Sequence, residues 1–325
     1  MKIGVYSPNW IGDAVLALPF IEYLKSQNPN AKICILCKEW VTDVYQNHPA
    51  IDELISIEKK YMESFLGSIK TGYLLRSKKF DSFYTLTDSF RSALILRISG
   101  SPKRIGYKSQ MRSILLTNSI KLPKKMIHRS EKYIKMINEN IFFSQNPKLY
   151  VSDDEKEWGL KEIKKMQLKQ PIALFPFSVA NARTIPNIVL KKWIQNSNKN
   201  YIVFGSKDDN SKGEELVRLF NNLSIKSICG KYSLRQSIIL ISLCNYAIAT
   251  DSGLGHISAA LGVPTISFFG IGIPEITSPI GMKSIIIKHC NPCLNELCEN
   301  VNDTVCLKKI TKKDIEVALN RVVNM

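Results

Sequence analysis

The chain is poor in the residues and motifs that mark the commonest catalytic folds. It has only four histidines, and they stand too far apart for two metal ligands on one helix. It contains no Gly-Lys-Ser phosphate loop, no Gly-x-Ser-x-Gly turn, and no Gly-x-Gly-x-x-Gly after its first predicted strand. These absences argue against a P-loop enzyme, an α/β-hydrolase and a nicotinamide-dependent dehydrogenase.

Long apolar runs are also absent. No run reaches the roughly 18–20 residues that are needed to span a bilayer. The first residues, 1–8, read as a strand and a turn and lack the apolar core of a signal peptide. We therefore expect a soluble, cytoplasmic chain that can rest on the inner face of a membrane through its surface.

Acidic residues are scarce compared with basic ones. The sequence has 28 Asp and Glu against 45 Lys and Arg, which gives a net charge of +17. Such an excess favours an anionic partner, which could be nucleic acid, a phosphorylated glycan or an anionic membrane face. A lysine-rich surface without a partner would give the same count. No aromatic RNA-binding signature accompanies the charge, which weakens nucleic acid as the partner.

What the sequence does contain is a repeated alternation of strand and helix patterns, with 45% hydrophobic residues and a length suited to two domains. The predicted strands are 2–6, 32–37, 55–57, 83–86, 172–175, 201–204, 225–228, 246–249, 265–269 and 284–287. Alternation of this kind indicates parallel sheets covered by helices. We expect an α/β protein with two doubly wound Rossmann-like domains, 1–155 and 156–325, facing each other across a cleft, with the last helix, 311–323, packing back on the first domain.

The loop after the strand 246–249 is the most informative segment. It reads Asp251-Ser252-Gly253-Leu254-Gly255 and leads into a helix of small residues that starts near His256. A helix N-terminus offers free N–H groups and a positive dipole end, and glycines allow a ligand to approach the backbone. The loop therefore predicts a phosphate site, although a ligand-free turn capped by Asp251 or Ser252 would look the same.

Two further loops carry candidate chemistry. Asp13 follows the first strand at the start of a helix, where a carboxylate could act as a general base or simply as a helix cap. Ser178 and Arg183 lie in the loop after strand 172–175 and could bind phosphate oxygens. Asp208 and Asp209 follow the next strand and could bind a ribose diol or cap the following helix.

Four cysteines gather near the C-terminus, at Cys290, Cys293, Cys298 and Cys306. One Cys-x2-Cys pair with two more cysteines nearby could hold a structural zinc ion. A reduced or partly disulfide-linked loop is the alternative.

Taken together, these segments resemble the lipopolysaccharide heptosyltransferases of glycosyltransferase family 9. The resemblance covers essentially the whole chain. It rests on Trp-Ile-Gly-Asp at 10–13, Asp-Ser-Phe-Arg-Ser-Ala-Leu at 88–94, Arg-Ile-Gly-Tyr at 104–107 followed by Met-Arg at 111–112, Phe-Gly-Ser at 204–206, Asp-Ser-Gly at 251–253 with His256, and the cysteine-containing tail.

The resemblance implies the two-domain GT-B fold and an inverting transfer of L-glycero-D-manno-heptose from ADP-heptose to the heptosyl-Kdo-lipid A inner core. It implies no cofactor and no catalytic metal, a nucleotide-sugar donor, an anionic glycolipid acceptor at the inner membrane face, no nucleic acid, and a monomer. Asp13 then matches the catalytic base. The donor site comprises Ser178, Arg183, Asp251, Ser252, Gly253 and His256, and acceptor contacts are expected from Trp10, Arg91, Arg104 and Arg112.

The chain departs from the family in one place. Arg183 stands where the family usually has lysine in an Ala-Lys-Arg-Trp-Pro string, which here reads Ala-Arg-Thr-Ile-Pro at 182–186. This departure leaves a nucleotide-sugar-binding protein with weakened catalysis as one alternative. A heptosyltransferase of type I or III, or one that modifies a protein, is another, because acceptor choice depends on loops of the first domain.

Overall fold

The computed structural model describes residues 1–325 except 63, 142–144, 195–196, 221–223, 289–304 and 324–325. The chain divides into two compact units, Met1–Pro147 and Lys148–Met325, whereas the sequence suggested a division between residues 155 and 156. Each unit contains one six-stranded sheet in which every pairing is parallel. The expected α/β architecture with two doubly wound sheets is confirmed.

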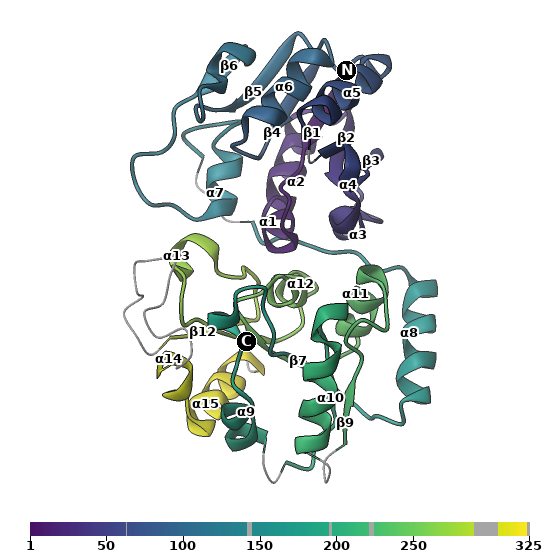
Figure 1. Cartoon of the computed structure of the whole chain (residues 1–325), viewed down its shortest axis with the longest axis vertical. Helices are drawn as coiled ribbons and strands as arrows, with labels where there is room; N and C mark the ends of the chain where they lie inside the picture. The colour runs from purple at the N-terminus through teal and green to yellow at the C-terminus, as the bar shows by residue number, and fades with distance from the viewer. Residues whose placement is uncertain (63, 142–144, 195–196, 221–223, 289–304, 324–325) are drawn as a thin grey trace. The chain divides into compact units, whose positions relative to one another are not determined.

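The sheet of the first unit has the strand order β3-β2-β1-β4-β5-β6 (Figure 1), which is the order of the dinucleotide-binding Rossmann fold. The central strands are apolar at successive positions. In β2, residues on both faces are buried from Ile33 to Cys37, as expected for a parallel strand covered on both sides. The strands are β1 (Lys2–Tyr6), β2 (Lys32–Lys38), β3 (Glu53–Ile57), β4 (Ser82–Thr85), β5 (Lys103–Tyr107) and β6 (Asn118–Ile120).

The helices of the first unit connect these strands. They are α1 (Ile11–Leu16), α2 (Leu18–Gln27), α3 (Thr42–Tyr45), α4 (Lys59–Met62), α5 (Phe65–Leu75), α6 (Phe90–Ile98) and α7 (Arg129–Ile134), with short 3-10 turns at Glu39–Val41, Arg76–Lys78 and Arg112–Leu115. The apolar spacing of Val15, Leu18, Ile21 and Leu24 is that of a single helix over 14–27. The structure breaks it at Ala17, because Pro19 has no N–H to donate to the carbonyl of Val15.

The second unit repeats the topology of the first. Its sheet has the order β12-β11-β10-β7-β8-β9, so that the chain again starts at the centre, winds outward and then returns to the other side. The strands are β7 (Ile172–Phe175), β8 (Tyr201–Val203), β9 (Ile225–Ser227), β10 (Ala247–Thr250), β11 (Thr265–Phe268) and β12 (Ser284–Ile287). All residues of β7, β10 and β11 are buried.

The helices of the second unit start at clear sequence signals. Ser152 and Glu155 form a capping box at α8, and Ser233 and Gln236 form another at α11. The helices are α8 (Asp153–Lys165), α9 (Asn187–Ile194), α10 (Asn210–Leu219), α11 (Leu234–Ser242), α12 (Gly253–Ala260), α13 (Pro274–Thr277), α14 (Val305–Lys308) and α15 (Lys312–Val323), with 3-10 turns at Asn181–Arg183 and Lys207–Asp209. The final helix, α15, packs on β11, β12 and α9 of its own unit.

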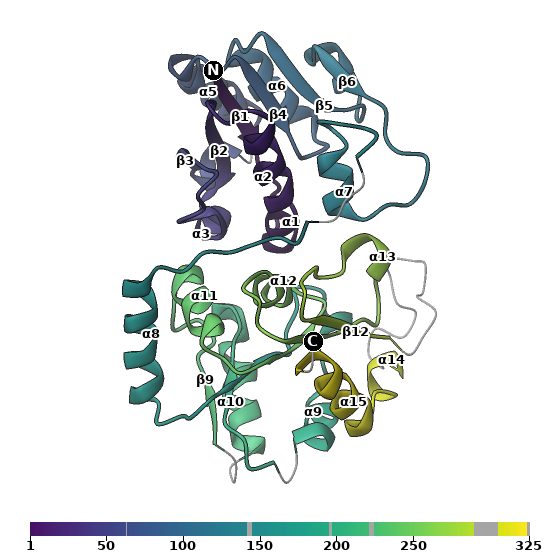
Figure 2. The same cartoon turned by 180° about the vertical axis from the view of Figure 1, so that it is seen from behind.

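Two strands of the first sheet were not foreseen from the sequence. β5 begins with Lys103 and Arg104, and β6 is a three-residue strand at the edge of the sheet (Figure 2). An edge strand such as β6 is covered less and needs less apolar sequence. β5 lies between β4 and β6, and its pattern is weak because it begins with the charged residues Lys103 and Arg104.

Each sheet has one point at which the strand order reverses. In the first unit it lies between β1 and β4, and in the second unit between β7 and β10. Ligands of open parallel sheets bind beyond the carboxyl ends of the strands at such points. The loops after these four strands are therefore where the site residues should be sought.

Candidate active site

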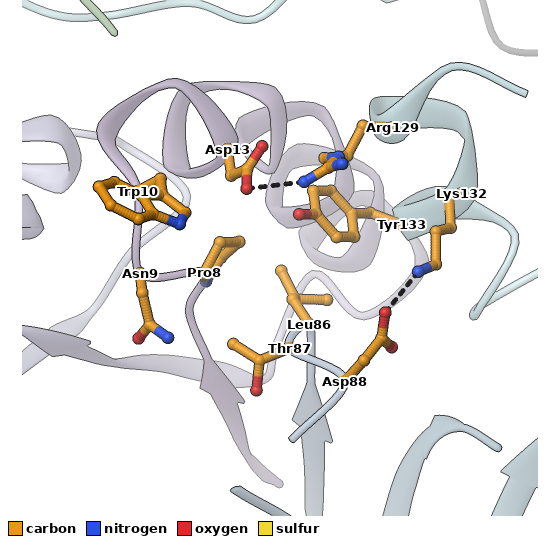
Figure 3. Close-up of a pocket in the computed structure, with 10 residues that line it drawn as sticks. All are labelled: Pro8, Asn9, Trp10, Asp13, Leu86, Thr87, Asp88, Arg129, Lys132 and Tyr133. Atoms are coloured by element: carbon orange, nitrogen blue, oxygen red, sulfur yellow. Dashed lines mark hydrogen bonds and ion pairs between the residues drawn. The ribbon is translucent and has the colours of Figure 1, made fainter. Parts of the chain in front are cut away.

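A pocket of about 210 Å³ lies at the reversal point of the first sheet (Figure 3). The loop after β1 and the loop after β4 form two of its walls, and α7 forms a third. The lining residues are Pro8, Asn9, Trp10, Asp13, Leu86, Thr87, Asp88, Arg129, Lys132 and Tyr133. The pocket combines two carboxylates and two cations with the phenol of Tyr133, which suits a polar, charged ligand.

Helix α7 brings its functional side chains to one side by helical spacing. Arg129, Lys132 and Tyr133 are three and four positions apart and share a face. Ser130 fixes the helix in place, because it is fully buried and its Oγ donates to the carbonyl of Leu16 at 2.6 Å. This hydrogen bond holds α7 against α1, so that residues of α7 line the same pocket as the loop after β1.

Asp13 is the acid at the centre of this pocket. It occupies the third position of α1, whose N-cap is Trp10 and has no side-chain cap bond, so Asp13 is not the helix cap. Its Oδ2 accepts a hydrogen bond from Nη1 of Arg129 at 2.8 Å. Burial raises the pKa of Asp13 above its usual range, although the charges of Arg129 and Lys132 act in the opposite direction. A carboxylate with a raised pKa is a better proton acceptor near neutral pH.

Asp88 holds the opposite wall of the pocket. Its Oδ2 pairs with Nζ of Lys132 at 2.7 Å, and its Oδ1 lies 3.4 Å from Nη2 of Arg112. Arg112 has no exposed side-chain surface and donates to the carbonyls of Tyr107, Thr87 and Ser89. It therefore supports the loop after β4 from behind.

The four residues expected to contact an acceptor fare differently. Trp10 lines the pocket and is exposed. Arg91, on α6, lies outside the lining of the pocket, and Arg104 donates to the carbonyls of Leu115 and Ser101 from the amino-terminal part of β5. Arg112 is buried and cannot reach a ligand directly. For Arg104 and Arg112 the structure thus replaces the expected contact with a supporting role, because their donors are taken by backbone carbonyls.

The site residues that the sequence did not reveal are Asp88, Arg129, Lys132 and Tyr133. Asp88 was noted only as part of a motif. The others lie in a charged segment that follows no predicted strand. The available signal in the sequence was the three-residue spacing of Arg129 and Lys132, with an aromatic residue, Tyr133, directly after them.

A second group of predicted residues meets at the reversal point of the second sheet. Nη1 of Arg183 lies 3.0 Å from Oδ2 of Asp251, and Oγ of Ser178 donates to the carbonyl of Asp251 at 3.4 Å. The Oγ1 of Thr250 donates to the carbonyl of Arg183. Ser178 and Arg183 follow β7 and Asp251 follows β10, so two loops that are distant in sequence are joined here.

Helix α12 starts beside this group. Its N-cap is Ser252, which makes no side-chain cap bond, and the Oγ of Ser252 is buried without a hydrogen-bond partner. The helix begins at Gly253, three residues earlier than predicted, and His256 is buried within it. The first turn of α12 therefore has N–H groups that no side chain of the N-cap satisfies, as a phosphate site requires.

Gly272 brings a third loop to the same place. It has a φ of +117°, and a Cβ there would lie 3.1 Å from Oδ2 of Asp251 and 4.0 Å from Nη2 of Arg183. A larger residue would thus be strained and would press on the ion pair. In contrast, Oδ2 of Asp209 accepts from the N–H and the hydroxyl of Ser206, so Asp209 completes a capping box at the 3-10 turn Lys207–Asp209.

The zinc hypothesis falls largely outside the described residues. Cys290, Cys293 and Cys298 lie in 289–304, and Cys306 is buried at the start of α14. Among the residues that the structure describes, no three His, Cys, Asp or Glu side chains are placed to hold a metal ion. Within the described ranges, no helix has both the length and the apolar character that are needed to cross a bilayer.

Comparison with known proteins places these features in a family. The model of glycosyltransferase family 9 (heptosyltransferase) matches residues 69–303. Lipopolysaccharide heptosyltransferase 2 of Escherichia coli K12 is 28% identical over 309 residues, covering 89% of this chain and 88% of that protein. Lipopolysaccharide heptosyltransferase 3 of the same strain is 26% identical over 277 residues, covering 80% and 79%. The solved structure of E. coli ADP-heptose LPS heptosyltransferase II has a TM-score of 0.85 and 26% identity, covering 100% of this chain and 99% of that one.

Proposed function

Because the chain belongs to glycosyltransferase family 9, the heptosyltransferases, we propose that it transfers L-glycero-D-manno-heptose from ADP-heptose to the heptosyl-Kdo-lipid A inner core of lipopolysaccharide. The observation that carries the proposal is the partly buried Asp13, paired with Arg129 and with its pKa raised by burial, in a charged pocket at the reversal point of the first sheet. The match to heptosyltransferase 2 over most of both chains supports the type II reaction.

In this proposal the first unit binds the acceptor and supplies the base. The carboxylate of Asp13 takes the proton from the acceptor hydroxyl, and the hydroxyl oxygen attacks the anomeric carbon of the heptose. The bond from that carbon to the ADP oxygen breaks, and its electron pair leaves with ADP. Attack opposite to the leaving group inverts the configuration. The cations Arg129 and Lys132 face the same pocket and suit the anionic sugars of the inner core.

The second unit binds the donor. The N-terminal turn of α12 and the guanidinium of Arg183 would meet the diphosphate, whose negative charge grows as the bond to heptose breaks. In the described structure Arg183 is paired with Asp251, so the donor must compete with that carboxylate or share the cation with it. These cationic and N–H groups perform the charge stabilisation in the proposal, and no cofactor or metal takes part.

The acceptor is the finer part of the proposal. Type III transfer is the runner-up, favoured by the match to heptosyltransferase 3, which covers less of both chains than the match to heptosyltransferase 2. The net charge of +17 favours an anionic glycolipid at the inner face of the membrane, where we propose that a monomer of the protein works as a peripheral enzyme.

A transfer assay tests the function directly. The full chain is incubated with ADP-heptose and with either heptosyl-Kdo-lipid A or Kdo-lipid A. The masses of the products are then measured by mass spectrometry. Addition of one heptose to the first acceptor only is the expected result. Transfer to Kdo-lipid A would indicate type I instead. Calorimetric binding of ADP-heptose without any transfer would indicate a binding protein.

A further inference from the structure

Helix α5 of the first unit presents four large apolar side chains to solvent, and its buried positions are small residues apart from Leu75. Leu66 is 75% exposed, Leu74 62%, Tyr73 56% and Phe65 55%. The buried positions are instead Gly67, Ser68, Thr71, Gly72 and Leu75. A surface helix ordinarily does the reverse and turns its large apolar residues to the core.

The small residues explain how α5 is held. It packs closely beside α6 (Figure 1), and a Cβ at Gly72 would lie only 2.6 Å from Cβ of Ile98. At Gly67 a Cβ would lie 2.2 Å from the carbonyl oxygen of Tyr61. The inner face is therefore already fully used by close backbone packing. The outward residues Leu66, Tyr73 and Leu74 fall on one face, at spacings of seven and eight residues.

The segment that carries this apolar face contains cations and no acids. From residue 65 to residue 79 the sequence contains Lys70, Arg76, Lys78 and Lys79 and no Asp or Glu. The guanidinium of Arg76 lies 4.4 Å from the ring centre of Tyr73. Lys78 is paired with Glu53, whereas Lys70 and Lys79 are exposed. Outward leucines and aromatics with a cationic border are the pattern of a helix that lies in a membrane interface.

We propose that the outer face of α5, defined by Phe65, Leu66, Tyr73 and Leu74, docks on the surface of an anionic lipid bilayer. The charge decides between possible occupants. A second copy of this chain, also at +17, would bring one cationic border against another, whereas anionic headgroups complement it. The inference deepens the proposed function, on which it rests for a membrane-bound acceptor, and it names the surface that would hold the enzyme at the membrane.

Vesicle flotation with the full chain tests the proposal. Vesicles contain phosphatidylcholine alone or phosphatidylcholine with phosphatidylglycerol. The variant Leu66→Gln/Leu74→Gln removes two outward leucines, and Leu160→Gln/Ile188→Gln is the matched control, since these residues are 58% and 60% exposed elsewhere. We expect binding to the anionic vesicles, a loss of about tenfold or more in the α5 variant, and no loss in the control. Lys70→Glu/Lys79→Glu should also weaken binding, and added salt should too.

Two outcomes would overturn the proposal. The first is equal vesicle binding by wild type and the two α5 variants. The second is a concentration-dependent dimer in wild type that Leu66→Gln/Leu74→Gln abolishes, because the face would then bind a second copy. Transfer to a deacylated, water-soluble acceptor is measured in parallel. Transfer by the α5 variant at the wild-type rate shows that the variant folds. If the wild-type protein transfers no heptose to this acceptor, the proposed function is contradicted and the lipid-binding result still stands by itself.

Discussion

The carboxylate of Asp13 and the guanidinium of Arg129 lie 2.8 Å apart although 116 positions separate them in the chain. The contact closes the pocket, because it ties α7 to the helix after the first strand. The charge of Arg129 also lowers the pKa of Asp13 and so opposes the burial that raises it. Several predictions about catalysis depend on this pair.

Replacing Asp13 with Asn should remove the base and leave the shape of the pocket unchanged. We expect Asp13→Asn to reduce heptose transfer by about 10²–10⁴, the usual share of general base catalysis. Donor affinity, measured by calorimetry with ADP-heptose, should stay near that of wild type. The control is Asp153→Asn, a fully exposed acid on α8. Full activity of Asp13→Asn would refute the role of this residue.

The pH profile should respond to Arg129. The base works only when ionised, so kcat/KM should fall as the pH drops through the pKa of Asp13, which burial places above the usual range for Asp. Arg129 lowers that pKa, so in Arg129→Gln it rises and the acidic limb should move to higher pH. Lys132→Gln should move the limb in the same direction but less, because its charge contributes less. If the acidic limb of the kcat/KM profile stays at the same pH in Arg129→Gln, the ion pair does not influence the catalytic base.

Removing the cation at the donor site should slow the chemical step. We expect Arg183→Ala to lower kcat/KM for ADP-heptose by about 10²–10³, as loss of one charge-stabilising group does. Arg183→Lys should retain part of the activity, because it keeps the charge without the planar two-donor geometry. Arg218→Ala, on the exposed side of α10, is the control. Equal rates for all three variants would place the donor phosphates elsewhere.

Arg112 should matter for stability more than for ligand affinity. Arg112→Met leaves the carbonyls of Tyr107 and Ser89 without their buried donor, and we expect a loss of about 3 kcal/mol in the free energy of unfolding. Arg91→Met, at an exposed position of α6, should change it by less than about 0.5 kcal/mol. Urea unfolding of both variants makes the comparison. Similar losses would mean that Arg112 is not the support described above.

Chelators should leave transfer intact. In the proposal, Arg183 and the N-terminus of α12 meet the charge that a divalent ion would otherwise neutralise. We expect the same initial rate for protein as purified and for protein dialysed against EDTA. A rate that falls with EDTA and returns with one added metal would contradict this.

The regular part of the fold was accessible from the sequence because buried parallel strands are apolar at every position. The strands β1, β7 and β12 have their predicted bounds. β5 and β6 were missed because Lys103, Arg104 and Asn118 interrupt the pattern. The sequence therefore did not predict that the first sheet has six strands, like the second. This became evident only from the pairing of the strands in the structure.

The candidate site was accessible where its residues directly follow strong strands. Asp13, Ser178 and Asp251 all do, and the structure brings Ser178 and Arg183 to Asp251 as the loop positions suggested. Arg129 and Lys132 were not identified because α7 is only six residues long and buries just Ser130, Tyr133 and Ile134, which is too short a segment for a periodic apolar pattern. The buried state of Arg112 was hidden for a similar reason, since a cation is ordinarily expected at the surface.

Each unit is one uninterrupted stretch of sequence, since the chain changes units once, between Pro147 and Lys148. A single genetic crossover near that codon would therefore exchange the whole first sheet and its pocket and leave the second sheet untouched. Evolution could pair one second sheet with many different first sheets in this way, and chimeric genes joined there would offer the same freedom in the laboratory.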